Sequence, residues 1–364
     1  MRATSRAPGS RGPSPVAELV IAGPGKLETP TGGYRYDARV LKDVSARGHE
    51  ASWLALPEDF PFPSAASMEA ALAALKGVPH DATLVIDGLA YGALPVEGIA
   101  ALARPVVALI HHPLALELGL APDAAASLAA SERDALAAAA LIVTTSEATR
   151  RVLVERFGAA EHKVRVAEPG VDPAAPTKGG GETPVVLTVG AVVPRKNHLG
   201  LARALAGLRD VPWRWRIAGS LTRDLDCATA LADEIARSGI EDRVETLGAL
   251  DDDGLEAAYL AADLFALPSY LEGYGMASAE ALARGLPVIA GRDEAAAALI
   301  GETAGALVDP DDFEAIAAAL RRFLTEPAAL RRASNAARLR AARLPRWFQC
   351  ADVFEHLITR PLPK

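Results

Sequence analysis

The sequence is poor in the residues that cross-link a chain or bind polyanions. It has two cysteines, Cys227 and Cys350, in 364 residues, and they form no CxxC or zinc-ligand spacing. This argues against a disulfide framework and against a structural zinc site, and it favours a cytoplasmic protein. Lys and Arg number 38 against 46 Asp and Glu. Because nucleic-acid affinity depends on clustered positive charge, we expect no nucleic-acid partner.

Long hydrophobic runs are also missing. No apolar stretch approaches the roughly 18 residues that a membrane-spanning helix needs, so we expect no transmembrane segment. Residues 1–15 are rich in Arg, Ser, Pro and Gly, and the apolar stretch that follows is too short for a signal peptide. We therefore expect a flexible tail over residues 1–15.

Short apolar runs alternate with amphipathic stretches along most of the chain. Strands buried on both faces of a parallel sheet are apolar without alternation, and helices cover such a sheet. In the first half, Arg35–Arg47 and Ala124–Ala139 have the helical pattern, and strands are expected at 17–22, 51–56, 82–86, 106–110, 140–144 and 164–167. Strands are expected again at 185–189, 213–218, 244–247, 264–267 and 288–290.

This rhythm predicts an α/β protein with two Rossmann-like, doubly wound domains. The first spans residues 16–172 and the second residues 184–344. Between them, residues 173–183 (PAAPTKGGGET) are rich in Pro and Gly without periodicity, as a linker would be. After Pro345, residues 345–364 have an apolar helical face, which we expect to pack across the domain junction.

The segment 267–290 has the most informative pattern. It reads as strand, glycine turn, helix, turn and strand, with the helix expected to begin near Tyr274 or Gly275. Unpaired N–H groups of a first helical turn bind anions, and glycine lets a ligand approach the backbone closely. A diphosphate is therefore expected to contact the turn formed by Gly273, Tyr274, Gly275 and Met276.

Two glutamates flank the start of this helix. Glu272 lies just before it, and Glu280 lies about two turns along the segment. Carboxylates accept hydrogen bonds from hydroxyls, so a sugar and a ribose are suitable partners. The spacing alone equally allows Glu280 to be a solvated helix residue.

Other strand ends carry further candidates. Arg195 and Lys196 follow the strand 185–189, where they would neutralise a diphosphate, and Arg195 is the less certain of the two because a solvated loop position fits it equally. Glycines at turns that open helices or end strands would let phosphates approach the backbone. These are Gly32, Gly33, Gly190 and Gly219, with Ser220 beside the last.

A histidine pair, His111 and His112, ends the strand 106–110, at the sheet edge where open α/β sheets bind ligands. Side chains alternate along a strand, so we expect only one of the two to face a ligand. The residues alone leave the choice open.

Together these motifs resemble the retaining GT-B glycosyltransferases of family 4, also called glycosyl transferases group 1, from about Leu19 to Leu357. The resemblance implies that Glu272 contacts the transferred sugar, Glu280 the ribose and Lys196 the diphosphate. A histidine after the strand 106–110 would face the donor sugar, and the Pro-Leu-Ala that follows slightly favours His112. Many members carry an arginine where this chain has Ala191, which leaves Arg195 as a nearby substitute.

The function implied is transfer of a hexose, with retention of configuration, from a nucleotide sugar, UDP- or GDP-linked, to a small-molecule or glycan acceptor. No cofactor is expected, and no metal, because no DxD-type carboxylate pair stands at a strand end. The stretch 116–136 favours a soluble acceptor because acidic residues dominate it: Glu117, Asp123, Glu132 and Asp134 against Arg133. The alternatives are a nucleotide-sugar 2-epimerase and a catalytically silent GT-B binding subunit.

Overall fold

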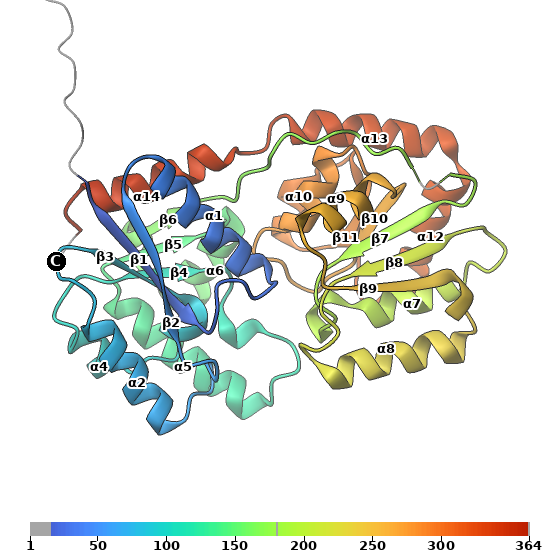
Figure 1. Cartoon of the computed structure of the whole chain (residues 1–364). Helices are drawn as coiled ribbons and strands as arrows, with labels where there is room; N and C mark the ends of the chain where they lie inside the picture. Colours follow the sequence, from blue (N-terminus) through green and yellow to red (C-terminus); the bar gives the residue numbers. More distant parts are fainter. Residues whose placement is uncertain (1–15, 180, 363–364) are drawn as a thin grey trace, which may run out of the picture.

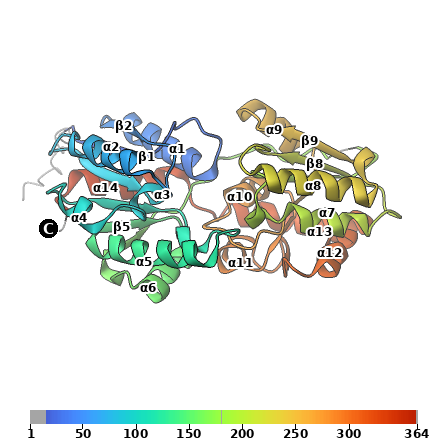
Figure 2. The same cartoon turned by 90° about the horizontal axis from the view of Figure 1, so that it is seen from below.

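The computed structural model describes residues 16–179 and 181–362, so the tail predicted over residues 1–15 lies outside the described residues. Two α/β domains lie side by side, each built on one parallel sheet of six strands (Figures 1 and 2). The predicted pair of doubly wound domains is therefore confirmed.

The first domain contains β1 to β6, in the sheet order β2-β1-β3-β4-β5-β6. Its strands are β1 (Glu18–Pro24), β2 (Glu50–Leu56), β3 (Thr83–Asp87), β4 (Val107–Ile110), β5 (Leu141–Thr144) and β6 (Val164–Val166). Its helices are α1 (Gly32–Ala46), α2 (Ala65–Lys76), α3 (Gly88–Tyr91), α4 (Val96–Ala100), α5 (Pro122–Ala138) and α6 (Glu147–Phe157), with the 3-10 turns η1 (Leu114–Leu116) and η2 (Glu161–Lys163).

Side chains of the central strands alternate between two apolar layers, which is why these strands read as continuous apolar runs. In β1, Val20 and Ala22 pack with α2 to α6 on one face of the sheet. Leu19 and Ile21 pack with α1 on the other face. Both faces of the first sheet are thus covered.

The second domain repeats this plan, with the sheet order β12-β11-β10-β7-β8-β9. Its strands are β7 (Val185–Val189), β8 (Arg214–Ala218), β9 (Val244–Gly248), β10 (Leu264–Leu267), β11 (Val288–Gly291) and β12 (Gly305–Val308). Its helices are α7 (His198–Ala206), α8 (Leu225–Ser238), α9 (Asp252–Leu260), α10 (Met276–Ala283), α11 (Glu294–Ile300), α12 (Phe313–Thr325) and α13 (Pro327–Ala341), with the 3-10 turns η3 (Pro194–Lys196) and η4 (Glu241–Arg243).

The chain passes between the domains twice. The predicted linker, 173–183, leads into the second domain and is hydrogen-bonded to it, through Thr177 N to Arg284 O at 2.9 Å and Lys178 N to Leu260 O at 3.0 Å. A second segment, just after α13, returns to the first domain and ends in helix α14 (Trp347–Thr359). Both views place α13 with the second domain and α14 with the first (Figures 1 and 2).

The two crossing segments touch each other. Val171 N donates to Pro345 O at 2.9 Å, and a Cβ on Gly170 would stand 2.0 Å from the backbone nitrogen of Trp347. Residue 170 must therefore be glycine for the returning chain to pass. Beyond this crossing, Trp347, Cys350, Phe354 and Leu357 complete the apolar layer over β1 and α1, which Met276 of the second domain also contacts.

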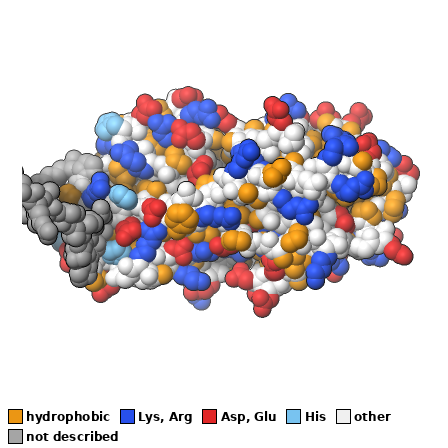
Figure 3. Space-filling view, turned by 90° about the horizontal axis from the view of Figure 1, so that it is seen from above, with side chains coloured by type: hydrophobic (Ala, Val, Ile, Leu, Met, Phe, Trp, Pro, Cys, Tyr) orange, Lys and Arg blue, Asp and Glu red, His pale blue; other side chains and the backbone are white. Residues whose placement is uncertain are grey.

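The face that carries α13 and α14 has acidic and basic side chains interspersed (Figure 3). Within residues 16–179 and 181–362, none of the helices combines the length and the apolarity needed to cross a bilayer.

Candidate functional site

A cleft of about 560 Å³ lies between the domains at the carboxyl ends of both sheets. Every site residue predicted from the sequence lines it: Gly32, Gly33, His111, His112, Gly190, Arg195, Lys196, Gly219, Ser220, Glu272, Gly273, Tyr274, Gly275, Met276 and Glu280. Residues more than 200 positions apart in the sequence thus meet in one place. This is the expected location, because open α/β sheets bind ligands beyond the carboxyl ends of their strands.

A buried ion pair joins Lys196, from η3, to Glu272, which precedes α10. Lys196 Nζ lies 2.7 Å from Glu272 Oε1, and the two side chains are only 17% and 14% exposed. Burial alone would raise the pKa of the Glu272 carboxyl, but the charges of Lys196 and Arg195 outweigh it and hold that pKa below its usual value. Burial lowers the pKa of the Lys196 ammonium, and Glu272 opposes this.

Arg195 lies beside this pair and reaches across to the first domain. Its Nε donates to both carboxylate oxygens of Glu117, at 3.1 and 3.2 Å, and its Nη1 donates to Leu271 O at 2.6 Å. The distance from Nη1 to Glu272 Oε2 is 4.0 Å. Burial would raise the pKa of the Glu117 carboxyl, but hydrogen bonding from His112 and the charge of Arg195 lower it to about 2. Glu117 and Arg195 therefore form a charged link between the domains.

The glycine turn before α10 is shaped by close approach between the domains. Gly275 is the N-cap of α10 and has a left-handed φ of 96°, with no side chain capping the helix. A Cβ on Gly273 would lie 2.1 Å from His111 O. Thr149 Oγ1 in the first domain donates to Gly273 O at 3.1 Å. The helix thus begins one residue after the predicted Gly275, with its first N–H groups uncapped beside the cleft.

Glu280 faces the cleft rather than bulk solvent. Its Oε2 accepts a hydrogen bond from Tyr259 Oη at 3.1 Å, and the Arg284 guanidinium lies 4.5 Å from the centre of the Tyr259 ring. Burial raises the pKa of the Glu280 carboxyl, and the charge of Arg35 partly offsets this. The interpretation of Glu280 as a solvated helix residue is therefore wrong.

The glycines at the other turns differ in how tightly they are enclosed. A Cβ on Gly219 would stand 1.9 Å from Gly190 O, so these two turns of the second domain touch each other. A Cβ on Gly33 would lie 3.2 Å from His111 Cδ2, whereas one on Gly32 would meet nothing within 4 Å. Ser220 Oγ accepts from Thr222 N at 3.2 Å and so shapes its own loop.

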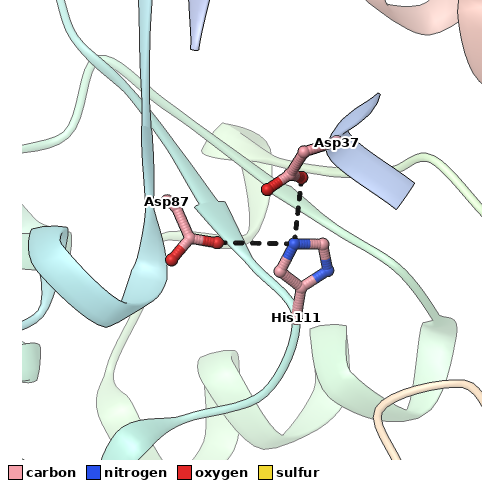
Figure 4. Close-up of side chains that lie close together, drawn as sticks. All are labelled: Asp37, Asp87 and His111. Carbon is pink, nitrogen blue, oxygen red and sulfur yellow. Dashed lines mark hydrogen bonds and ion pairs between the residues drawn. The ribbon is translucent and has the colours of Figure 1, made fainter. Parts of the chain in front are cut away.

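His111 is held by two buried carboxylates. Its Nε2 lies 3.1 Å from Asp37 Oδ1, on α1, and 3.5 Å from Asp87 Oδ2, at the end of β3. The other ring nitrogen points away from both (Figure 4). Burial would lower the pKa of the imidazole, but the two carboxylates raise it above its usual value. Burial, together with the charge of Asp37, raises the pKa of the Asp87 carboxyl to about 7.

His112 turns the other way, and its Nε2 lies 2.9 Å from Glu117 Oε2. Burial lowers the pKa of this imidazole below its usual value. Both histidines line the cleft, each held by different carboxylates, and that only one of them faces the donor sugar stays a prediction. The strand β4 ends at Ile110, and strict alternation no longer applies beyond it.

Sequence reasoning missed Asp37 and Asp87 as site residues. Each lies under 2% exposed, and Asp37 Oδ2 has no hydrogen-bond partner among the described residues. With His111 they form a group whose ligand atoms lie within 4.8 Å of one another, close enough to hold a metal ion. A search for a DxD-type pair at a strand end does not find this group, because its two aspartates stand 50 positions apart, one on a helix and one on a strand. Asp87, directly after an apolar run, was the detectable signal.

The charged stretch 116–136 also differs from its interpretation in the sequence. Glu132 is buried and accepts from Leu114 N and Ala115 N, at 2.6 and 2.9 Å, so it anchors η1. Glu117 is paired with Arg195. The exposed charges on α5 reduce to Asp123, Arg133 and Asp134, which makes this surface less acidic than the sequence indicated.

Family models match two adjoining parts of the chain. Residues 54–175 match the model described as Glycosyltransferase Family 4, and residues 175–340 match the one described as Glycosyl transferases group 1. An MMP alpha-(1->4)-mannosyltransferase from Mycolicibacterium hassiacum is 28% identical over 83% of this chain and 77% of its own length. A D-inositol 3-phosphate glycosyltransferase from Kineococcus radiotolerans is 35% identical over 64% of this chain, which spans 59% of that relative.

Solved structures share the fold. A sucrose-phosphate synthase from Thermosynechococcus elongatus superposes with a TM-score of 0.78 at 21% identity, covering 93% of this chain and 98% of that one. The Anabaena protein HepE, solved in complex with UDP and glucose, gives 0.75 at 18% identity with the same coverage. Both similarities extend over the two domains and the cleft between them.

Proposed function

Because the chain belongs to the group 1 glycosyltransferases of family 4, which have the GT-B fold, we propose that it transfers a hexose, with retention of configuration and without a metal, from a UDP- or GDP-sugar to a hydroxyl acceptor. The observation that carries the proposal is the Lys196–Glu272 pair, 2.7 Å apart beside the uncapped start of α10. The UDP and glucose bound to HepE and the mannosyl transfer by the M. hassiacum relative support a hexose donor.

Each of these residues has a role in the proposal. The donor diphosphate lies against the first turn of α10 and the touching glycine turns at Gly190 and Gly219. Lys196 leaves Glu272 to meet the diphosphate, and the freed carboxylate accepts hydroxyls of the sugar. Glu280, on α10 and hydrogen-bonded to Tyr259, accepts the ribose hydroxyls. The charge that develops on the leaving group is thus stabilised by groups already in place.

Two arginines supply the positive charge that many family members carry at the position of Ala191. Arg195 stands 4.0 Å from Glu272, next to Lys196. Arg223 lines the cleft on the loop that also carries Gly219 and Ser220, and no carboxylate within ion-pair distance of it is found among the described residues. A free guanidinium beside a glycine turn is suited to forked donation to phosphate.

His111, rather than the slightly favoured His112, is assigned to the sugar. The carboxylates of Asp37 and Asp87 raise the pKa of His111, so its outward nitrogen keeps a proton to donate to a sugar hydroxyl. His112 has a lowered pKa and holds Glu117 instead. A donor must carry its proton at working pH, which favours His111.

The reaction proposed is a front-face displacement. The bond between the anomeric carbon and the diphosphate oxygen breaks, the acceptor oxygen bonds to that carbon from the same face, and the acceptor proton passes to the leaving phosphate oxygen. No protein nucleophile takes part in this proposal, because the Glu272 carboxylate that Lys196 frees is engaged with hydroxyls of the sugar. In this proposal charged side chains and the glycine turns stabilise the leaving diphosphate without a metal, so addition of a chelator should leave the rate unchanged.

The acceptor is proposed to be a molecule in free solution. The exposed charges of α5 are two acids and one arginine, Asp123, Asp134 and Arg133, which gives no basic face for an anionic membrane. The inositol 3-phosphate used by the K. radiotolerans relative is not carried over to this chain, which spans 59% of that protein.

Thermal shift and nucleotide release with UDP-, GDP- and ADP-sugars test the proposal. One donor should stabilise the protein, and Lys196→Ala and Glu272→Ala should abolish both the shift and the release. Glu245→Ala, which breaks the Arg216–Glu245 pair on the same domain, is the matched control and should change neither. Proton NMR of the product gives the anomeric configuration.

Several results would count against the proposal. A response to no donor would favour a binding subunit without activity, and release of nucleotide that needs no acceptor and leaves a rearranged sugar would favour an epimerase. A covalent glycosyl-enzyme trapped by mass spectrometry would overturn the front-face reaction. Loss of rate with EDTA would overturn metal independence and point to Asp37, Asp87 and His111 as the ligands.

A further inference from the structure

The first-domain wall of the cleft is apolar beyond the His111 group. Its apolar lining comes from the loop after β2, the start of α3, η1 and its following loop, and α5, and includes Phe62, Leu89, Leu114, Leu118, Leu120 and Leu128. Phe62 is 56% exposed and Leu118 is 39% exposed. Large apolar side chains exposed at the mouth of a cleft indicate a surface that a ligand covers.

This wall has almost no positive charge. Among the described residues that line the cleft, the first domain contributes one arginine, Arg35, and no lysine. Its Nη2 lies 3.1 Å from Asp252 of the second domain, and its charge partly offsets the raised pKa of Glu280, which places it on the ribose side of the cleft. No lysine or arginine of the first domain is therefore left beside the apolar residues.

The polar groups that border the apolar wall are two carboxylates and the imidazole between them. Asp87 lines the cleft, with Asp37 buried behind it, and both carboxylates contact the same nitrogen of His111 (Figure 4). A phosphate placed here would compete with these carboxylates for the single charge of His111, and no lysine or arginine of the first domain stands beside the apolar residues to pair with it. Burying an anion without such a partner is costly, so this wall disfavours a phosphorylated group.

We propose that this wall is the acceptor subsite, and that it takes an uncharged molecule with an apolar face and hydrogen-bond donors, rather than a phosphorylated polyol. The apolar face covers Phe62 and Leu118, and donor groups of the acceptor meet Asp87. The reacting hydroxyl then lies next to His111, where the first-domain wall meets Lys196 and Glu272. The inference rests on the proposed function, because it takes the opposite wall as the donor site.

The test compares two probes that share a body and differ by a phosphate: 2-naphthylmethanol and 2-naphthylmethyl phosphate. Their binding to the full chain is measured by calorimetry, with and without saturating UDP or GDP, and inositol 3-phosphate is the third probe. The alcohol should bind at least about tenfold more tightly than its phosphate ester, a difference of about 1.4 kcal/mol. Inositol 3-phosphate should not bind detectably.

Variants of exposed residues locate the site without risk to the fold. Phe62→Ala and Leu118→Ala should each weaken the alcohol by about fivefold or more while leaving nucleotide affinity unchanged. Phe348→Ala and Leu339→Ala remove exposed apolar side chains away from the cleft, 60% and 68% exposed, and should have no effect. Leu118→Lys supplies the missing cation and should improve binding of the phosphate ester.

The outcomes distinguish failure of the acceptor inference from failure of the proposed function on which it rests. Tighter binding of the phosphate ester or of inositol 3-phosphate, particularly if Arg223→Gln abolishes it, would overturn the inference. Failure of the alcohol to bind while UDP or GDP binds would overturn it as well and leave the transferase proposal standing. Binding of the alcohol with no nucleotide binding would support the subsite and contradict the proposed function.

Discussion

Each partner of the Lys196–Glu272 pair stabilises the other's charge away from water. A buried carboxylate that loses its cation keeps its desolvation penalty, so removing one partner of such a pair destabilises a fold more than removing both. Arg195, 4.0 Å away, replaces only part of the lost attraction.

Lys196→Met should therefore lower the free energy of unfolding by about 3 kcal/mol. The double variant Lys196→Met/Glu272→Gln should regain part of that loss, because it leaves no unpaired charge. Urea denaturation of the two single variants and the double variant measures the coupling. Additive losses would mean that the two side chains do not interact in the free protein.

Asp87 gives the stability a pH dependence of definite sign. Its pKa is raised from 3.8 to about 7, mainly by burial, so the native state holds this proton more tightly than the unfolded chain does. The stabilisation is present in full below pH 3.8 and disappears as the pH rises through about 7. His111, Asp37 and Tyr34 are the titratable groups that face it.

Asp87→Asn removes this pH-dependent contribution to the free energy of unfolding. Between pH 4 and 7 the variant should gain stability relative to the natural protein, by on the order of 1 to 3 kcal/mol across the window. Denaturation at a series of pH values measures the difference. Asp123→Asn, at an exposed position on α5, is the control and should follow the natural protein. A difference independent of pH would show that Asp87 is already ionised at low pH.

At the scale of elements, the glycine turns are of two kinds. In one kind the fold itself requires glycine, and in the other glycine only leaves room for a ligand. A Cβ on Gly219 would stand 1.9 Å from a backbone oxygen, whereas one on Gly32, at the first position of α1, would meet nothing within 4 Å. Substitution at the two positions thus acts on different properties.

Gly219→Ala should unfold the protein at lower denaturant, because the backbone of two turns must move. Gly32→Ala should leave stability unchanged to within about 1 kcal/mol, since alanine is favoured in helices. If phosphate approaches this turn, Gly32→Ala should still weaken donor binding. Thermal unfolding and nucleotide titration of the same samples separate the two effects, and unchanged affinity would remove Gly32 from the donor site.

Most strands could be predicted from the sequence because their apolar runs are buried on both faces. The edge strand β12 (Gly305–Val308) was missed, since three of its four residues are only partly buried and its sequence carries a weak apolar signal. The glycine turns and Glu272 could be found because their residues are contiguous. Asp37 and Glu117 could not, and Asp87 left only the signal of its place after an apolar run, because the meeting of these residues depends on helices and loops whose packing no short pattern encodes.

At the scale of the whole molecule, ion pairs join the two domains across the cleft, and a bound ligand would interact with some of the same charged side chains. Arg195–Glu117, Arg35–Asp252 and Arg151–Glu294 each join the two domains. Arg35 and Asp252 have side chains 43% and 92% exposed, so salt screens that pair strongly, whereas Arg195 is 14% exposed and its pair is screened less.

Glu117→Gln should widen the distribution of interdomain distances in the absence of nucleotide, as measured by small-angle X-ray scattering. Bound nucleotide should restore the natural profile, because phosphate then supplies the negative charge that Arg195 has lost. Glu245→Gln, which breaks a pair within the second domain, should leave the scattering unchanged. Identical profiles for natural protein and Glu117→Gln would show that the Arg195–Glu117 pair is not needed to hold the two domains together.

The return of the chain through Pro345 into α14 sets an order of assembly during translation. The apolar layer over β1 and α1 stays open until Trp347, Cys350, Phe354 and Leu357 have left the ribosome. By then the whole of residues 184–344 has been synthesised and can have folded. The domain that is made first is therefore the last to be finished, and a chain released without residues 347–359 would combine a complete second domain with an incomplete first one.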